Sequence, residues 1–282
     1  IVPWQIVAQR QGAKLRFIPL TEGYRLNLEA ARSMISSKTK IITCGHVSNI
    51  LGVIQPVKEL AQMAKSVGAT FVVDGAQGAP HLPVDVKDIG CDFYTFSAHK
   101  LCGPTGVGVL WGRKELLDQM PPYKGGGEMI LKVTTEGSTW KPIPHKFEAG
   151  TPNIAGVIGL DYALKFFSKI DRKKALESDL ELGTRVFEEL KKNSRVTVYL
   201  DQPTDWIGIL SFYHQDIHPH DLASIMDQFG VCVRAGHHCG QPLMDYLGVS
   251  ATTRVSPFIY NTHKDIDRFF EALEKAQHLF KI

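Results

Sequence analysis

The chain has 282 residues, of which 44% are hydrophobic and 22% are charged, and its formal net charge is +3 at pH 7. These values are ordinary for a globular protein, and the lysines and arginines do not gather into the basic patch that nucleic-acid binding requires. No apolar run approaches the length of a membrane span, so neither nucleic acid nor a membrane is an expected partner.

The first half of the chain alternates short apolar runs with amphipathic stretches. It begins at Ile1 without an initiator methionine, so we expect an N-terminally truncated chain. The alternation predicts βαβ units and a mostly parallel sheet with helices on both faces. The expected strands are residues 14–19, 40–44, 70–74, 91–96 and 106–111, and the expected helices lie near 27–36, 56–67 and 113–120.

A second pattern follows two predicted helices near residues 155–192. It predicts strands at 195–200, 207–213 and 231–234, and helices at 219–229 and 263–280. This change indicates a smaller C-terminal α/β domain. We therefore divide the chain into a large domain at residues 1–165 and a small domain at residues 166–282.

Polar residues follow three of the predicted strands, where open parallel sheets bind their ligands. They are His46 and Asn49 after the strand at 40–44, Asp74 and Gln77 at the end of 70–74, and Ser97, His99 and Lys100 after 91–96. An aspartate and a lysine from separate strands suit pyridoxal phosphate, because lysine forms a Schiff base and aspartate keeps the pyridine nitrogen protonated. The alternatives, that Asp74 caps a helix and that Lys100 is merely solvated, remain open.

The five cysteines form no CxxC pair, which argues against a disulfide framework and a zinc site and favours a reducing compartment. Cys44, Cys91 and Cys102 are interpreted as packing residues. Cys239 lies in "VCVRAGHHCGQPLM", a glycine-containing loop with an arginine and two histidines before a predicted helix. This setting is typical of a nucleophile. A metal site is not expected there, because adjacent side chains rarely converge on one ion.

Seven segments, taken in chain order, resemble the group II, SUF-type cysteine desulfurases of the class V aminotransferase-like family. They are "HVSNILGVIQPV", "VDGAQGAPHLPVDV", "CDFYTFSAHKLCGPTGVGVL", "GGGEMI", "FEAGTPN", "RAGHHCGQPL" and "YNTH". The resemblance implies PLP fold type I, a homodimer, and conversion of L-cysteine to alanine. It also implies a cytoplasmic enzyme, with an organellar location left open, that passes sulfur to an acceptor protein for iron-sulfur cluster assembly.

The resemblance implies a role for each residue that would hold pyridoxal 5'-phosphate. By position, Lys100 would form the Schiff base, Asp74 would pair with the pyridine nitrogen, and Gln77 would donate a hydrogen bond near the phenolic oxygen. Ser97 and His99 would hold the phosphate.

The remaining implied roles concern the second subunit and the substrate. Thr151 would serve the phosphate of the neighbouring subunit. Asn49, which also borders the cofactor, would receive the substrate carboxylate together with Arg254, and Arg234 would line the pocket. Cys239 would accept the sulfur as a persulfide.

Three alternatives to a cysteine desulfurase stay open. Another class V enzyme would share Asp74 and Lys100 but would not need Cys239. A selenocysteine lyase would share all of these residues. A catalytically incompetent fragment would act only as an interaction partner. The sequence also departs from the family in having Gly240 where alanine is usual after the cysteine.

Overall fold

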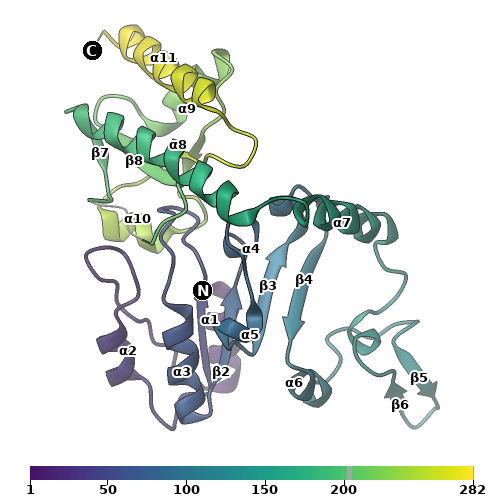
Figure 1. Ribbon diagram of the computed structural model, residues 1–282. Coiled ribbons are helices and arrows are strands. Elements are labelled where there is room, and N and C mark those ends of the chain that lie inside the picture. Colours follow the sequence, from purple (N-terminus) through teal and green to yellow (C-terminus); the bar gives the residue numbers. More distant parts are fainter. Residues whose placement is uncertain (202–204, 282) are drawn as a thin grey trace.

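The strands of the described residues form two four-stranded sheets and a separate two-stranded hairpin. The computed structural model describes residues 1–201 and 205–281 (Figure 1). The first sheet comes from the first half of the chain and the second from the second half. Helices accompany both sheets, so the predicted α/β class is confirmed.

The first sheet consists of three parallel strands and one antiparallel edge strand, in the order β1-β2-β3-β4. The strands are β1 (Ile41–Gly45), β2 (Thr70–Asp74), β3 (Phe93–Ser97) and β4 (Gly108–Gly112). Helix α3 (Val57–Val67) connects β1 to β2, and α4 (Gly78–His81) and α5 (Val86–Ile89) lie between β2 and β3. The four strands predicted for this region are confirmed, with small shifts at their ends.

Helix α3 packs on β1 and β2 through one apolar face. Its buried residues, at the spacing of a single helix face, are Val57, Leu60, Ala61 and Ala64. Phe71 and Val73 of β2 alternate toward this face and are buried. The packing fixes β2, and therefore the position of Asp74 at its end.

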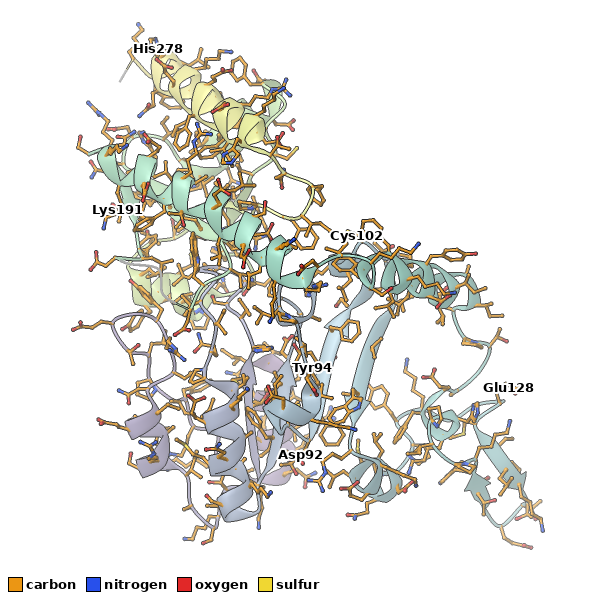
Figure 2. All side chains as sticks on the ribbon, viewed as in Figure 1. Asp92, Tyr94, Cys102, Glu128, Lys191 and His278 are labelled. Carbon is orange, nitrogen blue, oxygen red and sulfur yellow. The ribbon has the colours of Figure 1, made fainter. Side chains whose placement is uncertain are left out.

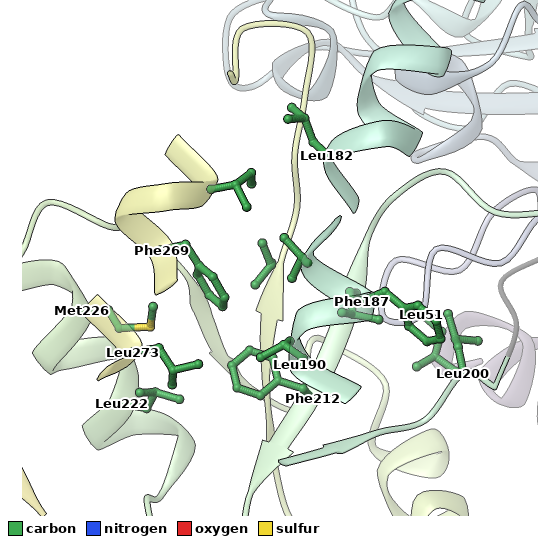
Figure 3. Close-up of a cluster of buried hydrophobic side chains, with 14 of the residues drawn as sticks. Leu51, Leu182, Phe187, Leu190, Leu200, Phe212, Leu222, Met226, Phe269 and Leu273 are labelled. Atoms are coloured by element: carbon green, nitrogen blue, oxygen red, sulfur yellow. The ribbon is translucent and has the colours of Figure 1, made fainter. Parts of the chain in front are cut away.

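The second sheet is antiparallel and has the order β7-β8-β10-β9. Its strands are β7 (Val196–Val198), β8 (Leu210–His214), β9 (Arg234–Gly236) and β10 (Thr252–Val255). Helices α8 (Arg172–Lys192), α9 (Pro219–Gln228) and α11 (His263–Leu279) pack with it around the apolar cluster of Figure 3. At its centre the rings of Phe212 and Phe269 meet edge to face at 6.2 Å.

Helix α8 joins the two halves of the molecule. At its first residue, Arg172 Nη2 lies 2.6–3.1 Å from the carbonyl oxygens of three residues at the end of α4, namely Ala79, Pro80 and Leu82. Two turns further, the buried Asp179 lies 3.3 Å from His81 Nδ1. Burial raises the pKa of Asp179, against the opposing effects of His81 and Arg172. These contacts fix the start of α8 to the first sheet, while the rest of it packs on β7 and β8.

Five further helices and the separate hairpin complete the elements named here. They are α1 (Val2–Gln11), α2 (Leu28–Met34), α6 (Lys114–Gln119), α7 (Ile154–Phe167), α10 (Gln241–Leu247), and the hairpin strands β5 (Ile130–Val133) and β6 (Ser138–Trp140). Helix α7 exposes several apolar side chains, among them Val157, Ile158 and Tyr162. Within the described ranges, no helix is both long enough and apolar enough to cross a membrane.

Three sequence predictions were wrong or displaced. Residues 14–19 form no strand, and the isolated bridge nearby joins Leu20, just after this range, to Leu26. The strand predicted at 231–234 lies at Arg234–Gly236. Cys102 is exposed, with φ at 55°, and is not a packing residue. The domain boundary predicted between residues 165 and 166 stays a prediction.

Candidate active site

The carboxyl ends of β1, β2 and β3 lie at one edge of the first sheet because these strands are parallel. Gly45 of β1 pairs in register with Asp74 of β2, and Asp74 pairs with Thr95 of β3. The segments that follow these strands carry the residues predicted from the sequence at strand ends. The structure therefore brings these three segments side by side, where open parallel sheets bind ligands.

Asp74 is held in a tight turn that leaves part of its carboxylate free. Its Oδ1 accepts a hydrogen bond from the backbone N–H of Ala76 at 2.9 Å. Among the described residues, Oδ2 accepts none, and the side chain is exposed. Gly75 is required here, because a Cβ at this position would lie 2.0 Å from the ring of Tyr94. Gln77 follows, half-buried, just before α4.

A buried pair that the sequence analysis missed supports this turn. His46 Nδ1 lies 2.9 Å from the hydroxyl of Tyr94, and burial lowers the pKa of His46 to about 4. The imidazole is therefore neutral at physiological pH. A Cβ at Gly78 would lie 2.5 Å from His46 Nδ1. The two glycines, Gly75 and Gly78, are therefore the sequence feature that indicates bulky side chains packed against this turn. Tyr94 is labelled in Figure 2, within the first sheet.

Lys100 lies in the short 3-10 helix η1 (Ala98–Leu101), directly after β3. Its side chain is half-buried and, in the described part of the chain, makes no hydrogen bond or ion pair. Burial lowers the pKa of Lys100, the charge of Asp74 opposes this effect, and Arg254 and Arg234 reinforce it. Ser97 precedes the helix and is half-buried, whereas His99 is exposed.

Two arginines of the second sheet lie side by side. Arg234 of β9 and Arg254 of β10 are direct cross-strand partners, an arrangement that destabilises a sheet unless an anion neutralises it. Burial, reinforced by Arg234, lowers the pKa of Arg254 to about 10. Arg254 Nη1 donates to the backbone carbonyl of Asn49 at 2.7 Å, but neither arginine forms an ion pair with a carboxylate in the described ranges. The pair is thus suited to an anionic ligand.

Cys239 lies beside this arginine pair. The thiol is exposed, and Arg234 Nη2 lies 3.5 Å from its Sγ. The Asn49 side chain donates to the backbone carbonyl of His238 at 2.5 Å, so the segment after β1 contacts the cysteine loop directly. The charge on Cys239 raises the pKa of Lys100, and its effect is smaller than those of burial, Asp74 and the two arginines. The structure therefore brings Lys100, Asp74, Arg254 and Cys239 to one site between the sheets.

Thr151 is the one predicted site residue that lies apart from this group. It is exposed in the segment between the 3-10 helix η2 (His145–Phe147) and α7. It makes no hydrogen bond to the other site residues across the ranges that the structure covers. This position leaves its assignment to a neighbouring subunit as a prediction.

The chain is similar to proteins of known family. A model of the family described as Aminotransferase class-V matches residues 1–269. The chain is 48% identical over 280 residues to a probable cysteine desulfurase of Halalkalibacterium halodurans, covering 99% of this chain and 68% of the relative. It is 44% identical over 280 residues to a cysteine desulfurase of Haloferax volcanii, covering 99% of this chain and 66% of the relative. It thus spans about two thirds of these relatives' length.

Solved structures give the same result. The cysteine desulfurase CsdA of Escherichia coli, in an S-sulfonic acid form, superposes with a TM-score of 0.95 at 39% identity, covering 99% of this chain and 69% of that one. An apo cysteine desulfurase of Thermococcus onnurineus gives a TM-score of 0.93 at 39% identity, covering 98% of this chain and 69% of that one. These likenesses confirm the fold and the family that the sequence motifs indicated.

Proposed function

The chain belongs to the Aminotransferase class-V family, and from this membership we propose that it acts as a pyridoxal-phosphate-dependent cysteine desulfurase with Lys100 and Cys239 as its reacting groups. The named relatives support the cysteine desulfurase activity. The single observation that supports the assignment of residues is the meeting of Lys100 and Asp74 from one sheet with Arg254 and Cys239 from the other.

The donor set fits pyridoxal 5'-phosphate. Lys100 offers an amine without a hydrogen-bond partner in the described ranges, and the free oxygen of Asp74 can accept a hydrogen bond from the protonated pyridine nitrogen. Gln77 would bind the phenolic oxygen, and Ser97 and His99 would bind the phosphate. When bound, the cofactor supplies an electron sink for the electron pair released at the substrate Cα.

Lys100 and the two arginines divide the work on the substrate. Because its pKa is lowered, the amine of Lys100 is neutral in a larger fraction of molecules and can accept the Cα proton. Arg254 and Arg234 receive the carboxylate of L-cysteine, which neutralises their mutual repulsion. Asn49, whose backbone carbonyl accepts a hydrogen bond from Arg254, would place its side-chain amide beside that carboxylate.

Cys239 completes the reaction at the sulfur. The thiolate of Cys239 attacks the sulfur of L-cysteine, a sulfur–sulfur bond forms as the carbon–sulfur bond breaks, and the carbon skeleton leaves as alanine after protonation. The guanidinium of Arg234, 3.5 Å away, stabilises the negative charge on Sγ before the attack. The persulfide on this exposed residue can then be passed to an acceptor protein, in support of iron-sulfur cluster assembly.

We also propose a homodimer in the cytoplasm. Helix α7 exposes apolar side chains next to the segment that holds Thr151, and burial of this face against a second copy would bring Thr151 toward the other cofactor phosphate. The five cysteines are free, as a reducing compartment favours. Sedimentation analysis of the purified protein tests the dimer.

The enzymatic proposal is tested by measuring alanine formed from L-cysteine with pyridoxal phosphate supplied. Lys100→Ala should abolish both the turnover and the visible absorbance of the lysine-bound cofactor. The control Lys124→Ala, which changes an exposed lysine in a glycine-rich loop, should leave both unchanged. Normal turnover in Lys100→Ala would refute the assignment. Turnover with selenocysteine in place of cysteine separates a desulfurase from a selenocysteine lyase.

A further inference from the structure

His238, the residue before Cys239, is buried between two exposed neighbours. Only 2% of its surface is accessible, whereas His237 and Cys239 are exposed. Its imidazole points inward to β10, where Nε2 lies 2.9 Å from the hydroxyl of Thr252 and 3.1 Å from the Thr252 carbonyl oxygen. The loop that presents the thiol is therefore attached to the core of the second sheet by this ring.

The contacts determine the tautomer and charge of the ring. A carbonyl oxygen can only accept, so Nε2 carries the hydrogen and donates it to Thr252. Burial, followed by Arg254 and Arg234, lowers the pKa of His238 to about 4, so the ring is neutral at physiological pH. Its Nδ1 is buried and finds no partner in the described part of the chain. The ring is thus a single-donor anchor.

The backbone at this position needs an anchor. His238 has φ at 53° and Cys239 has φ at 63°, two successive residues other than glycine in the left-handed region. Such residues persist only where the surroundings hold them. Two contacts outside the turn do so, namely the imidazole on Thr252 and the Asn49 side chain on the His238 carbonyl. Inside the turn, the Gly240 amide donates to the His237 carbonyl at 2.9 Å.

We propose that His238 is a positioning residue for Cys239, whose inward imidazole holds the left-handed turn that presents the thiol beside Arg234. The inference rests on the proposed function in taking Cys239 as the sulfur acceptor. Without the hydrogen bond to Thr252, the turn relaxes and Sγ moves away from Arg234, while Lys100 and Asp74 on the other sheet stay in place.

Two substitutions at this position separate anchoring from packing. His238→Leu fills the buried space but has no donor. His238→Gln places an amide N–H2 near the position of Nε2 and can donate to the Thr252 carbonyl. If the His238 ring only fills space, leucine should preserve the turn better than glutamine. If its hydrogen bond to Thr252 holds the turn, glutamine should preserve it better than leucine. Thr252→Val is a milder third variant that removes the hydroxyl but leaves the carbonyl acceptor.

The first measurement needs neither cofactor nor activity. Hydrogen exchange by mass spectrometry follows the peptide with residues 237–240 in the full chain. His238→Leu should speed exchange of the Gly240 amide by about 10-fold, the value for loss of one buried hydrogen bond, and Thr252→Val by about 3-fold. His238→Gln should stay within about 2-fold of the unmodified protein. The control His214→Leu, another buried histidine of the second sheet, should leave this peptide unchanged.

The second measurement uses the protein with cofactor. His238→Leu should lower alanine formation from cysteine by about 10-fold and alter the rate with selenocysteine by less than about 2-fold, because selenium departs with less help from the thiol. Equal behaviour of the leucine and glutamine variants, or equal exchange in His214→Leu, would overturn the proposal. If the unmodified protein converts neither amino acid, the proposed function fails, and hydrogen exchange still decides the role of His238.

Discussion

Gly208 provides the sharpest test of how the second sheet is fixed to α8. It has φ at +85°, and a Cβ there would lie 2.4 Å from the carbonyl oxygen of Asp179. That oxygen belongs to the backbone of α8, so no side chain can turn aside. The left-handed conformation costs an alanine about 1–2 kcal/mol, and overpacking costs about 1–3 kcal/mol. Gly208→Ala should therefore lower the free energy of unfolding by about 2–5 kcal/mol.

Two companion variants isolate the close approach. Gly230 has φ at +72° with open space around it, so Gly230→Ala should lose only the conformational part, about 1–2 kcal/mol. Gly183 lies within α8, where replacing a glycine by alanine ordinarily raises the free energy of unfolding by about 0.5–1 kcal/mol. Gly183→Ala should instead destabilise, because its Cβ would lie 2.5 Å from Gly208 Cα.

Urea denaturation measures all three variants, with the fluorescence of the buried Trp206 as a signal from this region. The reasoning is refuted if Gly208→Ala loses no more stability than Gly230→Ala. It is equally refuted if Gly183→Ala raises the free energy of unfolding.

Three further outcomes are expected. Cys239→Ala should retain cofactor binding and lose cysteine turnover by at least about 100-fold while keeping much of its selenocysteine activity, as paired assays of alanine would show; equal retention on both substrates would remove the thiol from the mechanism. Because burial lowers the pKa values of His46 and His238 from 6.5 to about 4, unfolding takes up protons in this range, so the free energy of unfolding should fall between pH 6.5 and pH 4. The fall should reach about 3 kcal/mol for each histidine, and His46→Gln should flatten it in urea titrations at stepped pH; an unchanged slope would contradict the assignment. Gly75→Ala should displace Tyr94 and the Asp74 turn, so fluorescence titration should show weaker pyridoxal phosphate binding, and unchanged affinity would count against the turn.

The first sheet could be predicted because its strands are apolar and separated by helices with a clear periodicity. The segment at residues 14–19, wrongly predicted as a strand, has apolar residues too, but no strand in the part of the chain that the structure describes pairs with it. Strand β10 was missed because it is only four residues long and reads Thr-Thr-Arg-Val, without apolar alternation. Thr252 and Thr253 are nevertheless buried, since their partners on β8 and β9 and the His238 ring satisfy them. These hydrogen-bond and strand partners come from distant parts of the sequence, so the local residue pattern around β10 does not indicate them.

The site was predictable in its residue types more than in its contacts. Strand ends and motif resemblance singled out Asp74, Lys100 and Cys239 as candidates. The side-by-side placement of Arg234 and Arg254 depends on the pairing of β9 with β10, and so it appeared only in the structure. The glycine at position 240 has a local reason, because a Cβ there would lie 2.4 Å from Cδ1 of Ile50, which follows β1.

Because α8 is attached to the first sheet at its first turns, a small rotation there would displace its far end by a much larger distance. The helix has 21 residues and therefore extends about 31 Å, so a rotation of about 5° around the Arg172 contacts moves its far end by about 3 Å. Strands β7 and β8 contact this helix, and β8 pairs with β10, which carries Arg254, so a rotation of the helix would carry these strands with it. Since a misplacement of about 1 Å at reacting atoms can cost about 100-fold in rate, the contacts that hold Arg172 and Asp179 against α4 would also matter for the position of the Cys239 thiol.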